Sequence, residues 1–430
     1  MNEVLQLAPL AVGAFVIAAA AVEFARRPVA LIYVLLGVHA WSLIGVVPSA
    51  QVLGVGVSPI DVVNVVAFLA ALLRMRRGPR TWQWPLLGAV ALIGYGVIRG
   101  IILLGDAALL GFRAELYFVV PAMFVSTLPK ACLPAVLQAV VRFGLALSLF
   151  ATVRWLLIAA GIELGPVAGD GIYTVTRVIS AHAALWVAVA LVFGVAALLH
   201  RAPQTRAHVL LAWSGLAFVV VLLSQHRSVW VATTIMLAVA FATARRHWYA
   251  KAAVVVAALL AVLVIEVGNL GEAGVVAESL SIAASDTSTW EWRIDRWANV
   301  WSTHAARGTQ AIILGSGYGY GWLSGVVGVW EVSPHNGFIQ VAVRLGLLGA
   351  ALVFFPYAAA IWRLGPTRDP TSRIIWLWTI GVLIYYIPYA GTMLTGILLG
   401  TGIVLLLTRT EAFDGVDAHV TPPTRPSRSR

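Results

Sequence analysis

The chain has 430 residues, of which 60% are hydrophobic and only 11% are charged, and its formal net charge is +11. This composition excludes a soluble globular protein that hides its apolar residues in one core, and it predicts a polytopic membrane protein. The single cysteine, Cys132, excludes an internal disulfide and a cysteine metal site. The positive charge is nearly all arginine in short connections, which indicates membrane topology and no nucleic-acid partner.

Apolar runs of about 15–25 residues divide the chain into candidate membrane helices. They lie near residues 5–24, 29–49, 59–73, 84–105, 114–128, 133–160, 178–199, 207–224, 228–244, 252–266, 336–362 and 374–408. The last run is long enough for two short helices broken at Ala390 and Gly391. The fold class expected is therefore all-α, with about 12 to 13 transmembrane helices.

Basic clusters occur at alternate connections, and the positive-inside rule places them in the cytoplasm. One connection on the other side is much longer than the rest and is net acidic. These features divide the chain into four parts. The expected parts are transmembrane helices at 1–266, a large periplasmic or extracytoplasmic loop at 267–335, C-terminal transmembrane helices at 336–410, and a disordered cytoplasmic tail at 411–430.

Within the large loop, residues 289–301 have the aromatic spacing of an amphipathic helix at the membrane interface. Long loops in compact proteins are usually functional. We therefore expect this loop to contribute to a site on the outer face.

The segment that begins at Ser333 places a histidine where a membrane helix starts. Ser333 suits the N-cap and Pro334 suits the first helical position, so His335 is expected at about the second residue of the helix. The partial positive charge of a helix N-terminus disfavours imidazolium, which predicts a lowered pKa for His335. A neutral imidazole can accept a proton, so His335 is the candidate catalytic base.

Alternation of the connections places Arg227, Arg293 and Arg296 on the same membrane face as His335. Guanidinium groups bind diphosphate through forked hydrogen bonds and keep their charge under ordinary conditions. These three arginines are therefore candidate ligands for a substrate diphosphate. The alternative is that they contact lipid phosphates and fix helix depth.

A helical wheel places Ala342, Gly346 and Gly349 beneath His335, as a smooth strip for a neighbouring helix. The same wheel puts Arg344 on the opposite side and deeper in the membrane. An arginine at that depth needs a partner or water. A lipid-entry groove and a paired carboxylate remain open as its surroundings.

Other polar residues indicate structural roles. Asp61 follows Ser58 and Pro59 as a helix-capping acid would, and Arg113 lies at the start of an apolar run. His182, inside an apolar run, is typical of a hydrogen-bonded core histidine. The glycine-rich run 315–321 is interpreted as a flexible turn that leads to His335, and no spacing indicates a metal site.

His335, Asn336, Gly346 and Gly349 match the pattern His-Asn, nine residues, Gly, two residues, Gly. With this pattern the chain resembles the O-antigen ligase and O-antigen polymerase superfamily. Three further segments are similar to that family: residues 224–232, the pair Arg293 and Trp297, and the glycines of 315–319. Arg344 departs from the family, which often has an acid or polar residue there.

The resemblance implies a membrane glycosyltransferase of the GT-C type that acts without a metal or other cofactor. It would move a glycan from undecaprenyl diphosphate to an acceptor hydroxyl at the periplasmic face of the bacterial inner membrane, with inversion. His335 would be the base, Arg227, Arg293 and Arg296 would hold the donor diphosphate, and Asn336, Gly346 and Gly349 would support them.

Several functions remain open at this point. A ligase, with lipid A-core as acceptor, is preferred over a polysaccharide polymerase and a protein O-oligosaccharyltransferase, which differ from it in acceptor. A transporter or flippase of lipid-linked oligosaccharide would also need many helices and intramembrane arginines. A non-catalytic assembly protein would depend on the large loop and not on His335.

Overall fold

A computed structural model describes residues 2–44, 50–52, 55–76, 78, 80–105, 108, 111–162, 178–200, 207–244, 288–320, 334–365 and 369–417. Nearly all of these residues are helical, apart from a short antiparallel hairpin of β1 (Ala50–Val52) and β2 (Val55–Val57). The chain is a polytopic, all-α membrane protein, as its apolar runs predict.

The apolar runs and the observed helices agree closely in position. The longer helices are α1 (Asn2–Arg26), α2 (Pro28–Ile44), α3 (Pro59–Arg74), α4 (Trp84–Leu104), α5 (Arg113–Ser126), α6 (Leu133–Ala159), α7 (Ala181–His200), α8 (Ala207–Leu223), α9 (Arg227–Thr243), α12 (Ser288–Ala305), α14 (Gly337–Leu364), α15 (Pro370–Tyr385) and α16 (Met393–Asp417). Short turns of helix are η1 (Thr81–Gln83), η3 (Lys130–Cys132) and α13 (Thr309–Leu314).

Four described helical segments are long and apolar enough to cross a membrane: Thr81–Leu104, Lys130–Ile158, Ala181–Leu199 and Gly337–Leu364. Shorter apolar helices accompany them, among them Pro28–Trp41, His208–Leu223, Arg227–Thr243 and Met393–Thr408. The expected run at 252–266 lies outside the described residues. The number of 12 to 13 spans therefore stays a prediction.

The core of the bundle is built by close helix contacts. Helix α7 is largely buried and packs against α6, α8 and α9, while α16 packs along α5. At Gly396 and Gly400 a side chain would overlap with Phe118 or Ala122 of α5. Small residues let these two backbones approach, which is how membrane helices gain packing energy without a hydrophobic drive from water.

The C-terminal run is broken into two helices, as expected at Ala390 and Gly391. Helix α15 ends at Tyr385 and α16 begins at Met393, so residues 386–392 form a connection between them. Helix α16 continues to Asp417, and the expected tail therefore begins with helix, not with irregular chain.

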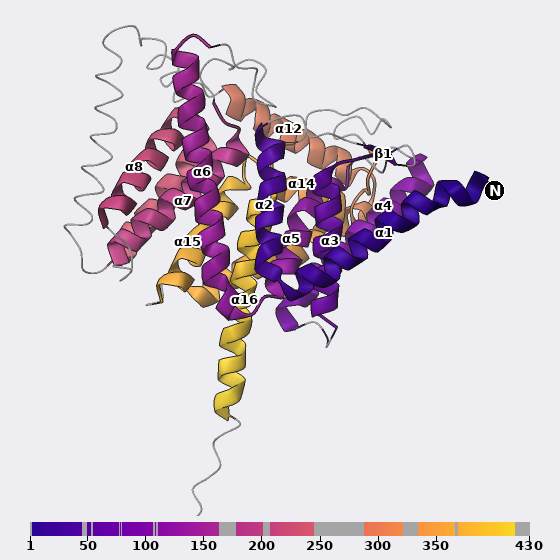
Figure 1. Cartoon of the computed structure of the whole chain (residues 1–430). Coiled ribbons are helices and arrows are strands. Elements are labelled where there is room, and N and C mark those ends of the chain that lie inside the picture. Colours follow the sequence, from indigo (N-terminus) through magenta and orange to yellow (C-terminus); the bar gives the residue numbers. More distant parts are fainter. Residues whose placement is uncertain are drawn as a thin grey trace, which may run out of the picture.

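Helix α12 differs from the others in orientation. It lies across one end of the bundle, while the end of α16 projects from the opposite end (Figure 1). Trp290, Trp292 and Ile294 of α12 are exposed, and its other side contacts α13 and α14. This position fits the expected amphipathic helix in the large loop, and it brings α12 to the start of α14.

Candidate functional site

The histidine expected inside a helix lies just before it. Helix α14 begins at Gly337, and Asn336 is its N-cap, with its side-chain oxygen accepting a hydrogen bond from the Ile339 N–H at 3.0 Å. His335 has a φ of 47°, the left-handed region. The expectation that His335 is the second helical residue is therefore wrong, because the cap is provided by Asn336, three residues after Ser333. Ser333 lies outside the described residues.

Helix α12 presents a stripe of half-buried and buried side chains to the bundle. Arg293, Arg296, Trp297, Val300 and His304 recur at helical spacing on this side, while their neighbours are exposed. The indole N–H of Trp297 donates a hydrogen bond to the Pro334 carbonyl at 2.6 Å. This bond fastens α12 to the residue next to His335, so both arginines are held beside the histidine.

The charges of Arg293 and Arg296 act on His335. Partial burial and these two positive charges hold the pKa of His335 below its usual range. The direction is the one expected from the sequence, but the cause is different, because desolvation comes first and the arginines follow. Among the described residues, the Nε of Arg293 is buried without a hydrogen-bond partner. The hydrogen-bonding capacity of that buried donor is thus not used by the described part of the protein.

Arg227 is the first residue of α9, and its neighbours link it to the same region. His226 is the N-cap of α9, and its Nε2 lies 3.0 Å from the Ile179 carbonyl at the entrance to α7. Gln225, like His335, has a left-handed φ of 56°. His226 and His335 both act electrostatically on His182, so the starts of α9 and α14 converge near α7.

Sequence reasoning missed the aromatic and histidine side chains that surround His335. The ring of Tyr389 lies edge-on to His335, with ring centroids 6.4 Å apart. The Arg293 guanidinium lies 5.8 Å from the same tyrosine ring. His182 lies 5.8 Å from Tyr389 and shares a hydrogen bond of 2.6 Å with the Tyr385 hydroxyl. A lone histidine in an apolar run carries no sign of this arrangement.

The strip of small residues predicted beneath His335 is divided by a kink. Gly346 has a φ of 72° and divides α14 at a kink, so one helical wheel does not describe the whole segment. A side chain at Gly346 would overlap with the Ile313 carbonyl of α13, and one at Gly349 would overlap with Leu345 of the same helix. Gly346 therefore permits the kink and the close approach of α13, while Gly349 makes room for Leu345 of its own helix.

The Arg344 side chain is buried, and protein groups surround its guanidinium. Its Nη1 donates to the carbonyls of Gly317 and Tyr320 at 3.2 and 3.1 Å, and its guanidinium lies 5.7 Å from the Tyr318 ring. Glu115 of α5 interacts with it electrostatically and accepts a hydrogen bond from Gln340 at 3.0 Å. Of the two surroundings left open, the structure favours the carboxylate.

The glycine-rich run is a tightly held turn. Gly315 approaches the Arg344 backbone so closely that a side chain could not fit, and its carbonyl accepts from Arg99 at 3.0 Å. Ser316 donates its N–H to Val343 at 2.9 Å and shares a 2.6 Å hydrogen bond with His304 of α12. The described part of this run therefore ties α12 to α14, and it is not the flexible turn that was expected.

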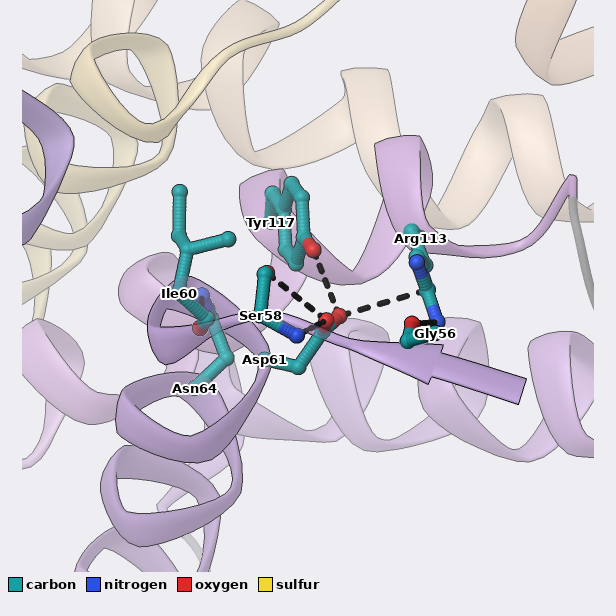
Figure 2. Close-up of polar contacts among 7 residues, drawn as sticks. All are labelled: Gly56, Ser58, Ile60, Asp61, Asn64, Arg113 and Tyr117. Atoms are coloured by element: carbon teal, nitrogen blue, oxygen red, sulfur yellow. Dashed lines mark hydrogen bonds and ion pairs between the residues drawn. The ribbon is translucent and has the colours of Figure 1, made fainter. Parts of the chain in front are cut away.

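The acidic cap at Asp61 is confirmed and has further partners. Its carboxylate accepts from the Ser58 N–H and hydroxyl at 2.7 and 2.8 Å and from the Tyr117 hydroxyl at 2.5 Å. Arg113 lies 3.3 Å from Asp61 and also donates to the Gly56 carbonyl (Figure 2). With these donors around it, Asp61 joins the hairpin to α3 and α5, which is a structural role.

A family model described as O-antigen ligase matches residues 210–354. The match supports a relationship of this part of the chain to the O-antigen ligase and polymerase superfamily. A search of curated proteins finds no match.

The superfamily match covers the start of α9, helix α12 and the start of α14, which are the elements that carry the three arginines and His335. It does not reach α7 or the connection after α15. The candidate site therefore includes two side chains, His182 and Tyr389, from outside the matched part of the chain.

Proposed function

We propose that the chain is a membrane glycosyltransferase that moves a glycan from undecaprenyl diphosphate to an acceptor hydroxyl on the periplasmic face, as an O-antigen ligase with lipid A-core as acceptor. The observation that carries the proposal is a half-buried histidine, with its pKa lowered by burial and by the neighbouring charges, held beside two arginines of α12. A polymerase or a protein O-oligosaccharyltransferase would use the same donor chemistry with another acceptor.

The lowered pKa of His335 suits a base that acts at neutral pH. In this proposal His335 takes the proton from the acceptor hydroxyl as its oxygen attacks the anomeric carbon. The bond from that carbon to the diphosphate oxygen breaks, and undecaprenyl diphosphate leaves with the electron pair. Attack opposite the leaving group inverts the anomeric centre.

The arginines supply the charge that the leaving group needs. Arg293 and Arg296 lie close enough to His335 to act on its charge, and the Nε of Arg293 has no hydrogen-bond partner among the described residues. Forked N–H groups hold diphosphate oxygens and stabilise the charge that develops on them. Arg227 stands at the start of α9, near the histidines of this region, and is proposed as a third ligand.

The test is transfer by the purified protein in liposomes. We would supply undecaprenyl-diphosphate glycan with lipid A-core, a second lipid-linked glycan or a serine peptide, and follow both the transferred glycan and released undecaprenyl diphosphate. His335→Ala is expected to reduce kcat by about 10²- to 10⁴-fold with donor binding retained. His208→Ala, an exposed histidine on α8, is the matched control.

Each outcome has a clear meaning. Equal turnover by wild type and His335→Ala would remove His335 as the base. Passage of intact donor across the bilayer without transfer would favour the flippase. Since the base must be unprotonated, the wild-type rate should persist at mildly acidic pH and fall only below the ordinary pKa range of histidine.

A further inference from the structure

Tyr389 lies at the junction of the groups proposed to bind donor and remove the proton. Its ring contacts His335 edge-on at 6.4 Å and lies 5.8 Å from the Arg293 guanidinium. Tyr385 stacks on the same ring at 4.9 Å with an interplanar angle of 14°. Tyr389 thus joins the histidine and the arginine, which come from two separate segments of the chain.

The support beneath Tyr389 is rigid. The Tyr385 hydroxyl shares a 2.6 Å hydrogen bond with Nδ1 of His182, and the Tyr389 N–H donates to the Tyr385 carbonyl at 3.2 Å. The next carbonyl, that of Tyr386, accepts from Gly337 at 2.8 Å. The connection after α15 is therefore fastened both to α7 and to the first residue of α14.

From this geometry we infer that Tyr389 is a positioning residue that holds the Arg293 guanidinium and the His335 ring in one fixed arrangement. The inference rests on the proposed function, because it assigns Tyr389 to that same site. Arginine has many rotamers, and a cation over an aromatic ring is held in place by the ring quadrupole. A fixed arrangement matters because a displacement of about 1 Å in a reacting group can cost a hundredfold in rate.

Two simpler interpretations account for less. Ordinary aromatic packing would explain the stack of Tyr389 on Tyr385, but not the guanidinium and the imidazole at the same ring. A sugar-stacking platform needs a free ring face, whereas Tyr389 is in contact with protein groups on several sides. The contacts favour positioning of other side chains.

The inference predicts a specific change in the titration of His335. Among the described residues, the groups that act on His335 or lie against it include Arg293 and Arg296 from α12, Tyr389 after α15 and His182 from α7. When Tyr389 loses its ring, Arg293 is released and His335 gains solvent. Both changes favour imidazolium, so the pKa of His335 should rise by about one unit.

The experiment compares Tyr389→Leu, Tyr389→Met and Tyr389→Phe. The two variants without a ring should lose about tenfold or more in kcat, and the acidic limb of their kcat profile should move to higher pH. Tyr389→Phe keeps the ring and should therefore show the wild-type kcat and the wild-type position of the acidic limb. Tyr33→Leu, the same change at an exposed tyrosine of α2, controls for a general effect.

A second measurement does not depend on turnover. Titration of ¹³C-labelled histidines by NMR gives the pKa of His335 directly, with the resonance assigned by its loss in His335→Gln. Arg293→Gln should raise the same pKa without touching Tyr389. If wild type shows no transfer but the NMR shifts appear, the proposed function fails and the positioning role stands.

Three results would overturn the inference. One is an unchanged His335 titration in folded Tyr389→Leu or Tyr389→Met. Another is a Tyr389→Phe variant as impaired as the leucine variant, because the hydroxyl would then be the important group. If the ringless variants do not fold, an unchanged pKa in Arg293→Gln decides against it.

Discussion

The residues His335 and Gln225 share a backbone conformation that side chains rarely adopt. Among the described residues they are the only non-glycine positions with positive φ, at 47° and 56°. Each directly precedes the N-cap of a helix, Asn336 for α14 and His226 for α9. Such a conformation costs about 1–3 kcal/mol and persists where surrounding contacts enforce it. The strain falls at the two segments that carry His335 and Arg227, which supports a site there.

Another residue, His304, should make stability depend on pH. It is buried on α12, shares a hydrogen bond with Ser316, and burial and the Arg307 charge lower its pKa to about 4. The folded pKa is below the unfolded value, so the unfolded chain binds the proton more readily. The stabilisation is therefore complete above about pH 6.5 and is lost as pH falls toward 4, by about 2 kcal/mol at pH 5.

Thermal unfolding in detergent between pH 7 and pH 4 checks this expectation. His304→Gln should be less stable at pH 7 and should show a flatter dependence on pH than wild type. His208→Asn, at an exposed position of α8, should follow the wild-type curve. Parallel curves for wild type and His304→Gln would show that His304 does not titrate with unfolding.

At the scale of elements, the kink in α14 joins the histidine to the rest of the site. The first half of the helix carries Asn336 and Arg344, and the second half packs against α4 and α16. Helix α13 approaches the kink at Gly346, and the following turn holds Ser316 against Val343. The kink therefore lets one helix hold His335 at one end and the glycine turn at its middle.

Gly346→Ala should destabilise the protein. The new side chain would overlap with the Ile313 carbonyl, and its backbone would stay in the left-handed region. We expect a loss of about 2 kcal/mol or more in the free energy of unfolding, together with reduced transfer activity. Unfolding temperature in detergent measures the first effect.

Gly94→Ala is the control for that change. Gly94 is an exposed residue of α4 with nothing within 4 Å of an added side chain, so alanine should be neutral or stabilise by about 0.5–1 kcal/mol. If Gly346→Ala is as stable as Gly94→Ala, the kink does not need glycine.

At the scale of the whole molecule, we expect the candidate site and the basic connections to lie on opposite sides of the membrane. Helix α12 crosses one end of the bundle (Figure 1), and the turn after α3, with Arg74 and Arg76, belongs to the basic connections predicted to be cytoplasmic. Exposed tryptophans on α12 fit the interfacial region of a membrane. We expect the site to face the exterior.

Cysteine labelling tests this sidedness, because the chain has a single natural cysteine, Cys132. In a Cys132→Ser background, Glu291→Cys on α12 should react with an impermeant maleimide in right-side-out vesicles. Arg76→Cys should react only after permeabilisation. Both positions are exposed in the fold, so the reverse pattern would mean the opposite orientation.

Much of the fold could be predicted because each membrane helix corresponds to a local run of apolar residues. The runs that became α3, α4, α6 and α9 agree with the observed helices to within a few residues, and the break after Tyr385 was expected at Ala390. The N-cap of α14 was misplaced by three residues, from Ser333 to Asn336, because both residue types can cap a helix. The kink at Gly346 was missed because a glycine in an apolar run is as typical of close helix packing as it is of a kink.

The amino-acid sequence by itself determined the membrane class and the superfamily pattern, and it predicts one membrane face for His335, Arg227, Arg293 and Arg296. These depend on local hydropathy, charge alternation and residue spacing, which any short window contains. Only the tertiary structure decided that Tyr389 and His182 lie near His335. It also decided that the Arg344 guanidinium donates a hydrogen bond to the Gly317 carbonyl. Such contacts join segments far apart in the chain, and their geometry follows from how whole helices pack, which no local pattern encodes.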